Sequence, residues 1–252
     1  MTAIVNVKNI TFGAGKPLIC VPLIGRTLAA ISEDARQLAE IQADVIEWRA
    51  DHFESVDDVN AVKAALQQVR AILPQVPLLF TFRSKKEGGE HELSDDAYFN
   101  LNSEIARSGL VDLIDVELFN EEPRIRALVA QAHSAGVKVI MSNHDFHKTP
   151  SKTEIIARLC RMQTLGADLP KIAVMPQSPH DVLVLLDATL TMKEEHATCP
   201  LITMSMGKTG VISRLAGEVF GSAMTFGAAR QASAPGQIAV QSLREMLNVL
   251  SH

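Results

Sequence analysis

The chain has 252 residues, of which 47% are hydrophobic and 21% charged, and it carries a formal net charge of -5. This composition is ordinary for a soluble globular protein, and the acidic balance argues against a general nucleic-acid surface. No run approaches the roughly 18 apolar residues needed to span a bilayer, and the N-terminus lacks the basic and apolar segments of a signal peptide. Cys20, Cys160 and Cys199 lie far apart in apolar contexts, so we expect buried free thiols and a cytoplasmic location.

Apolar runs typical of strands alternate with segments whose apolar residues recur at helical spacing. A short hairpin is expected over residues 4–13, closing one end of the domain. Strands are predicted over residues 18–25, 44–51, 77–83, 113–119, 137–145, 169–175, 200–207 and 223–228. Helices are predicted over residues 28–42, 56–73, 94–108, 121–135, 151–166, 178–195, 210–220 and 236–250. Ser94 is a predicted N-cap and Gly136 a predicted helix stop.

The alternation of strands and helices predicts a parallel sheet in the α/β class. About eight such units in about 250 residues indicate a closed (β/α)8 TIM barrel. No shift in composition suggests a linker, so residues 1–252 are predicted to form a single barrel domain. An open doubly wound sheet is the alternative, but no Gly-x-Gly-x-x-Gly fingerprint follows any predicted strand.

Two predicted strands deliver reactive side chains. The apolar run at 137–141 ends in Ser142-Asn143-His144-Asp145, which places a histidine at the C-terminal end of a buried strand. Lys171 lies inside the apolar run at 169–175. A buried lysine is costly while charged, so its pKa tends to fall. A neutral amine near a histidine is suited to Schiff-base chemistry with proton transfer.

Other polar residues follow the remaining strands, and reactive groups of a barrel gather at the C-terminal strand ends. They are Glu47, Arg49, Asp51, Arg83, Glu87, Asp115, Glu117, Asp145, Thr203, Ser205, Arg214, Ser233 and Gln237. Simpler interpretations remain open for each residue: a snorkelling Lys171, a capping His144, or solvated surface charges. Glu47 and Arg49 alternatively form an internal ion pair. Their joint placement at one rim favours a functional site, and its cationic side chains disfavour a metal.

The motifs together resemble the type I 3-dehydroquinate dehydratases of the shikimate pathway, over essentially the whole chain. Asp115-Val116-Glu117-Leu118, followed about twenty residues later by Val139-Ile140-Met141-Ser142-Asn143-His144-Asp145, resembles that family's signature. Further matches are Glu47-Trp48-Arg49-Ala50-Asp51, Phe82-Arg83, Lys171-Ile172-Ala173, Met204-Ser205-Met206-Gly207 and Ser233-Ala234-Pro235-Gly236-Gln237. The matches are specific only as a set.

The resemblance implies a hydro-lyase that removes water from 3-dehydroquinate to give 3-dehydroshikimate, in the third step of chorismate and aromatic amino acid biosynthesis. It implies no metal and no organic cofactor. Lys171 would form an imine with the substrate ketone, His144 would act as general acid and base, and Glu87 would position His144. Substrate contacts are implied for Arg214, Ser233 and Gln237 at the carboxylate, for Glu47, Arg49 and Arg83 at the ring hydroxyls, and for Met204, Met206, Phe146 and Phe226 as apolar walls.

The family resemblance also implies a cytoplasmic homodimer with no nucleic-acid or membrane partner. Pro22 departs from the pattern, because some members place a substrate-contacting serine on the first strand. Two rival functions remain: a class I aldolase that also uses a lysine on strand six, and a non-catalytic barrel that binds a small acid or a partner protein. The aldolase would usually add a phosphate site near strands seven and eight, whereas the Arg, Ser and Gln set here favours a carboxylate.

Overall fold

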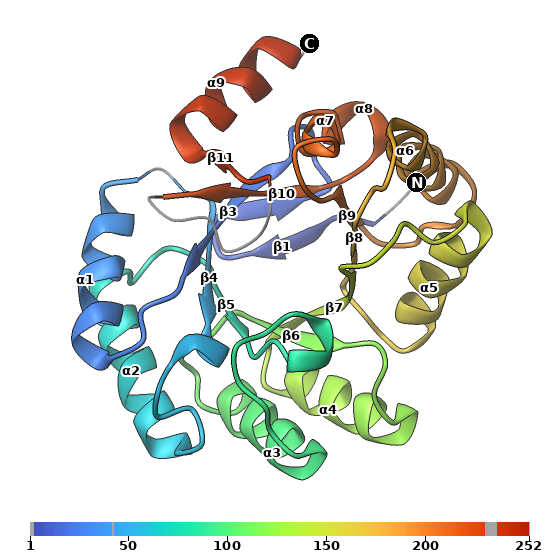
Figure 1. Cartoon of the computed structure of the whole chain (residues 1–252). Helices are drawn as coiled ribbons and strands as arrows, with labels where there is room; N and C mark the ends of the chain where they lie inside the picture. Colours follow the sequence, from blue (N-terminus) through green and yellow to red (C-terminus); the bar gives the residue numbers. More distant parts are fainter. Residues whose placement is uncertain (1–2, 42, 230–235, 252) are drawn as a thin grey trace.

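Eight parallel strands form a barrel with the helices outside it (Figure 1). The computed structural model describes residues 3–41, 43–229 and 236–251. The barrel strands, in chain order, are β3 (Leu18–Leu23), β4 (Val45–Arg49), β5 (Leu78–Thr81), β6 (Leu113–Glu117), β7 (Lys138–Asp145), β8 (Leu169–Val174), β9 (Ile202–Ser205) and β10 (Met224–Ala228). β10 pairs with β3, and a parallel bridge between Leu201 and Ser222 joins the β9 and β10 sides. The predicted TIM barrel is confirmed.

Each barrel strand is connected to the next through helical structure. The helices are α1 (Leu28–Ala39), α2 (Val59–Ile72), α3 (Asp95–Ala106), α4 (Glu122–Ser134), α5 (Lys152–Thr164), α6 (Pro179–Thr191), α7 (Val211–Leu215), α8 (Gly217–Phe220) and α9 (Val240–Leu250). Short 3-10 turns η1 (Ala50–His52) and η2 (Lys85–Glu87) follow β4 and β5, and a π-helical turn η3 (Met192–His196) extends α6. Among the described residues, no helix has both the length and the apolar character needed to cross a membrane.

Local sequence signals set most helix ends. The Ser94 side chain accepts a hydrogen bond from the Ala97 amide, as expected of an N-cap. Gly136 follows α4 with φ +75°, a left-handed conformation that glycine adopts at little cost. Two predictions at the C-terminal end were wrong. Residues 210–220 form two short helices, and residues 236–250 begin with a strand, β11 (Ile238–Ala239), that pairs with β10 before α9 starts.

The N-terminal end of the barrel is held by paired hydrogen bonds at alternate strand interfaces. Three aspartates immediately precede β4, β6 and β8, and each carboxylate accepts the amide of a residue at the start of the preceding strand. The pairs are Asp44 with Ile19 at 2.7 Å, Asp112 with Leu78 at 2.8 Å and Asp168 with Val139 at 2.8 Å. Each aspartate amide donates in return to the carbonyl of the same partner. These reciprocal bonds fix the register of neighbouring strands.

The predicted N-terminal hairpin, β1 (Val5–Val7) and β2 (Ile10–Phe12), is confirmed. Its buried side chains Val5, Val7 and Phe12 pack with the first inward-facing residues of the barrel strands. In Figure 1, β1 crosses the middle of the ring. The hairpin therefore closes the N-terminal end of the barrel, which leaves the opposite end for a ligand.

Pro22 is tolerated inside β3 because of the direction in which its missing N–H would point. The backbone of Ile19 faces β4, since its amide and carbonyl both bond to Asp44. Alternation turns the backbones of Cys20 and Pro22 toward β10. Pairing with β10 ends at Cys20 and Phe226, so no ladder bond is lost at Pro22.

The three cysteines are free, as expected, but only Cys20 is buried. Cys160 and Cys199 are partly exposed, so the expectation of three buried thiols was wrong for two of them. Burial and the Asp168 charge nevertheless raise the pKa of Cys199 to about 11. A thiol with a raised pKa is a poor nucleophile at neutral pH.

Candidate active site

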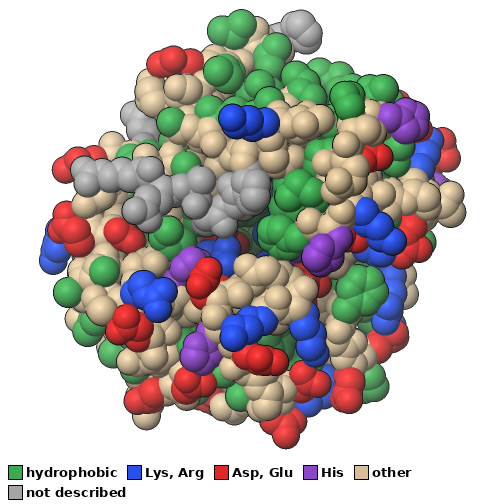
Figure 2. Space-filling model, in the orientation of Figure 1, with side chains coloured by type: hydrophobic (Ala, Val, Ile, Leu, Met, Phe, Trp, Pro, Cys, Tyr) green, Lys and Arg blue, Asp and Glu red, His purple; other side chains and the backbone are tan. Residues whose placement is uncertain are grey.

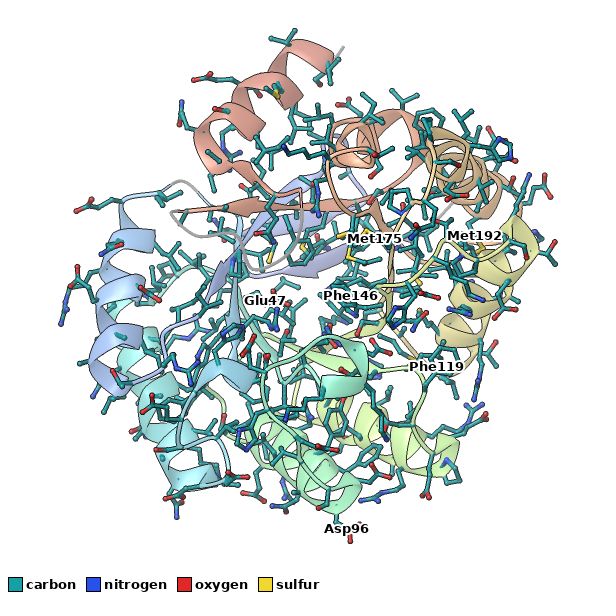
Figure 3. All side chains as sticks on the ribbon, in the orientation of Figure 1. Glu47, Asp96, Phe119, Phe146, Met175 and Met192 are labelled. Atoms are coloured by element: carbon teal, nitrogen blue, oxygen red, sulfur yellow. The ribbon has the colours of Figure 1, made fainter. Side chains whose placement is uncertain are left out.

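A single pocket contains every residue to which the family resemblance gave a role except Ser233, which lies outside the described residues. It encloses about 580 Å³ of empty space, part of it open to solvent. Its lining includes Glu47, Arg49, Arg83, Glu87, His144, Phe146, Lys171, Met204, Met206, Arg214, Phe226 and Gln237. Glu47 and Phe146 lie inside the ring of strands in Figure 3. Charged, histidine and hydrophobic side chains meet around the centre of the face in Figure 2. The pocket thus combines polar groups and apolar walls.

Lys171 lies in the middle of β8 and is 3% exposed. Its Nζ is 3.7 Å from Oδ2 of Asp115 and 3.9 Å from Oε1 of Glu47. The same nitrogen lies 4.6 Å from the centre of the Phe226 ring. Two carboxylates and an aromatic face therefore hold the amine inside the barrel, which offsets the cost of its burial.

His144 at the end of β7 is bound to Glu87 from η2. The Nδ1 atom of His144 is 2.9 Å from Oε2 of Glu87, and the backbone amide of His144 donates to the same oxygen at 3.0 Å. The Phe146 ring stacks on the imidazole, with centroids 6.4 Å apart. Gly88 contacts Phe146 so closely that an added Cβ would lie 2.5 Å from the ring. Glu87 and Phe146 thus fix the orientation of His144.

The protonation of the Glu87–His144 pair is set by its buried position. Burial and the nearby Glu117 charge raise the pKa of Glu87 to about 8. Burial and the charges of Arg83 and Lys171 lower the pKa of His144 well below its ordinary value. As the pH rises through about 8, the pair loses a proton. Glu87 is then a carboxylate that accepts a hydrogen bond from Nδ1–H of His144. Nε2 is then the basic nitrogen.

Arg83 connects the carboxylates of β6. Its guanidinium donates to Glu117 at 2.8 Å, to Asp115 at 2.9 Å and to the Ser142 hydroxyl at 2.9 Å. Burial alone would lower the pKa of Arg83, but Asp115 and Glu117 raise it well above its ordinary value. Burial also raises the pKa of Asp115, but Arg83 and Lys171 outweigh it, and the net pKa is lowered. Arg83 therefore stays charged and fixed.

Arg49 pairs with Asp51 rather than with Glu47. Nε and Nη2 of Arg49 each lie 2.7 Å from a carboxylate oxygen of Asp51, which is a bidentate pair. Asp51 also accepts the amide of Glu90 at 3.1 Å and that of Arg83 at 3.4 Å. The alternative interpretation, an internal ion pair of Glu47 with Arg49, is not what forms, because Glu47 instead accepts from Thr81 at 2.9 Å. Asp51 ties Arg49 to the loop that carries Glu87.

Arg214 on α7 also lines the pocket. It is buried, and burial lowers its pKa to about 10. Its Nη1 lies 3.8 Å from the sulfur of Met204. Gln237 lines the same pocket just before β11. A buried guanidinium beside apolar side chains is suited to an anionic ligand.

Asp115 and Glu117 were expected at the rim from the sequence, but with no role in the site. No role was expected for Ser142 and Asn143 either. Ser142 donates to Asp115 at 2.6 Å, and Asn143 donates to Glu87 at 3.2 Å. One signal was available: Asp115-x-Glu117 on an apolar strand requires buried partners.

A family model described as type I 3-dehydroquinase matches residues 19–252. The chain belongs to that family. A 3-dehydroquinate dehydratase of Klebsiella pneumoniae is 68% identical over 251 residues, covering 100% of both chains. One from Listeria monocytogenes is 63% identical over 246 residues, covering 98% of this chain and 97% of that one. The type I enzyme of Clostridium difficile, solved with covalently modified comenic acid, superposes with a TM-score of 0.96 at 57% identity, covering 99% and 98% of the two chains. The predicted family and hydro-lyase class are confirmed.

Proposed function

We propose that the chain removes water from 3-dehydroquinate to give 3-dehydroshikimate through an imine on Lys171. The observation that carries this proposal is the placement of the Lys171 amine in the same pocket as the Glu87–His144 pair, on the neighbouring strand. The family membership supports the substrate, since the relatives are named 3-dehydroquinate dehydratase. The reaction corresponds to the third step of chorismate and aromatic amino acid biosynthesis.

The amine of Lys171 adds to the substrate ketone, and loss of water gives the imine. Its protonated form withdraws electrons from the adjacent carbon, so a proton on that carbon becomes acidic enough to remove. Asp115 and Glu47, both within 4 Å of Nζ, stabilise the positive charge of the iminium. Hydrolysis of the imine after elimination releases product and restores the free amine.

His144 moves the proton. Nε2 takes the proton from the carbon next to the iminium, and the electrons form an enamine. The enamine then expels the hydroxyl, which takes that proton from His144 and leaves as water on the same face of the ring, a syn elimination. Glu87 accepts from Nδ1–H and stabilises the imidazolium formed between the two steps.

The remaining pocket residues bind the ring. Arg214, with Gln237 and Ser233, binds the substrate carboxylate, and the burial of Arg214 favours pairing with that anion. Glu47, Arg49 and Arg83 contact the ring hydroxyls. Met204, Met206, Phe146 and Phe226 form the apolar walls. We further propose that residues 1–252 act as one barrel domain, in a cytoplasmic homodimer.

Replacement of Lys171 tests the proposal. Lys171→Ala should reduce turnover of 3-dehydroquinate by several orders of magnitude, because no other amine replaces it as nucleophile. The matched control is Lys152→Ala, since Lys152 is a partly exposed residue of α5 paired with Asp187. Product is followed by the absorbance of its conjugated ketone. Normal dehydration by Lys171→Ala would reject the imine, and ligand binding without any turnover by the wild type would support a non-catalytic barrel.

A further inference from the structure

The Glu87–His144 pair continues outward through two side chains that have no role in the proposed reaction. Nδ2 of Asn143 donates to Oε1 of Glu87 at 3.2 Å. Oδ1 of Asn143 accepts from Nη1 of Arg158 at 2.8 Å. A chain of hydrogen bonds therefore runs from α5 through β7 to the carboxylate that holds His144.

Arg158 is anchored at the far end of this chain. Its Nε donates to Glu154 at 2.8 Å within α5, and its side chain is 17% exposed. Its Cζ lies 5.2 Å from the centre of the Phe119 ring, and Phe119 lies outside the ring of strands (Figure 3). Two contacts independent of the active site therefore fix the guanidinium that faces Asn143.

The chemistry of Arg158 sets the direction of the whole chain. A guanidinium only donates hydrogen bonds, so the Asn143 oxygen must face Arg158. The Asn143 amide group must then face Glu87 and donate to it. Without Arg158, the amide could rotate and present its oxygen, which a protonated Glu87 would satisfy but a carboxylate would not. Arg158 thus favours the carboxylate form of Glu87 without touching it, through the orientation of the Asn143 amide.

The other groups around Glu87 make this donor important. Glu117 and Asp115 of β6 oppose its negative charge, and Arg83 at 3.6 Å favours it. His144 of β7 contributes its backbone amide and Nδ1. Burial works against the charge, and the Asn143 hydrogen bond lowers the pKa of Glu87. Loss of that bond would raise the pKa of Glu87 further, because less would oppose the effects of burial and of the two carboxylates.

We propose that Arg158 and Asn143 are positioning residues that keep Glu87 an acceptor toward His144, an inference that rests on the proposed function of this pair. Neither residue belongs to the predicted site, and Arg158 does not line the pocket. Their contribution is to the proton-transfer step and not to substrate binding.

The test compares the pH dependence of kcat in Arg158→Met with the wild type. We expect the midpoint of the kcat profile to move up by about one pH unit, and kcat at pH 7 to fall by about tenfold, because a hydrogen bond to the charged form of Glu87 is lost. KM should stay within about twofold, since no substrate contact is removed. Arg158→Lys keeps a donor and should restore most of the profile. Arg161→Met, an exposed change on the same helix, is the control.

A double-mutant cycle shows whether Arg158 acts through Asn143. In an Asn143→Ala background, Arg158→Met should change kcat by less than about twofold. An equal loss in both backgrounds, or an unshifted profile in Arg158→Met, would overturn the proposal. Should Arg158→Met fail to fold, Asn143→Asp supplies the same test, because it places an acceptor against Glu87 and should also move the profile upward.

Borohydride trapping separates this proposal from the underlying reaction. The wild type and Arg158→Met should both form a reducible adduct on Lys171 in the presence of 3-dehydroquinate, because the hydrogen-bond chain from Arg158 to Glu87 does not include the Lys171 amine. Absence of the adduct in the wild type would reject the imine mechanism itself. A wild-type adduct combined with an unshifted kcat–pH profile in Arg158→Met would reject only the positioning role of Arg158 and Asn143.

Discussion

Replacement of Glu87 by glutamine should stabilise the protein while it damages activity. In the folded chain, burial and the Glu117 charge raise the pKa of Glu87 to about 8, from an ordinary value of 4.5. The unfolded chain therefore ionises at lower pH than the folded one, and this difference lowers stability as the pH rises between the two values. Glu87→Gln cannot ionise, so it removes that loss.

The size of the effect follows from the pKa difference. Each pKa unit corresponds to about 1.36 kcal/mol, so the buried carboxyl lowers the free energy of unfolding by about 5 kcal/mol in total, most of it between pH 4.5 and pH 8. Glu87→Gln should match the wild type below about pH 4.5 and exceed it increasingly up to about pH 8. Its kcat should fall at the same time, because a neutral amide stabilises the His144 imidazolium less than a carboxylate does.

Urea unfolding followed by circular dichroism at pH 5 and pH 8 measures the difference. Glu92→Gln, an exposed change in the same loop, is the matched control and should leave the pH dependence unchanged. Equal pH dependence in Glu87→Gln and the wild type would show that the pKa of Glu87 is not raised on folding, as would a wild type that gains stability over the variant as the pH rises.

Three further variants test two carboxylates of the barrel and the proposed substrate contact of Arg214. Asp51→Asn should lower the free energy of unfolding at pH 7 by about 3 kcal/mol, since a buried pair with Arg49 is broken. The lowered pKa of Asp51 means that this difference is present above the ordinary carboxyl pKa and shrinks as the pH falls through the folded-state value. Asp112→Ala should cost about 2 kcal/mol in urea unfolding and leave kcat unchanged, because Leu78 and Arg70 lose an acceptor far from the pocket. Arg214→Ala should raise KM by about tenfold or more, and an unchanged KM would place the carboxylate elsewhere.

The barrel could be predicted from sequence because each strand is a compact apolar run and each helix has a clear period and end signals. The prediction failed where the chain is short of such signals. Residues 210–220 contain too few turns to show whether one helix or two form, and β11 is only two residues long. Whether Pro22 fits inside a barrel strand depends on which neighbour its backbone faces, and the register with β10 that decides this is not visible in the sequence.

The candidate site could be predicted as a set of residues, but its internal pairing could not. Their positions on two consecutive predicted strands placed Lys171 and His144 near one another, and the family resemblance supplied Glu87. The bidentate bond of Arg49 to Asp51, and the separation of Glu47 from that pair, depend on side-chain conformation at the start of η1. The contact between Arg158 and Asn143 joins a helix face to a strand, which no periodicity in the sequence reveals.

Trapping of the substrate on the protein is the most direct test of the imine on Lys171. The protein is mixed with 3-dehydroquinate and sodium borohydride, and the adduct is measured by intact mass and located by peptide mapping. An imine on Lys171 should give one stable adduct per chain, on Lys171, and none in Lys171→Ala. Product formation without an adduct would show that elimination proceeds without a covalent intermediate, and an adduct on another lysine would show that the nucleophile lies outside the Glu87–His144 pocket.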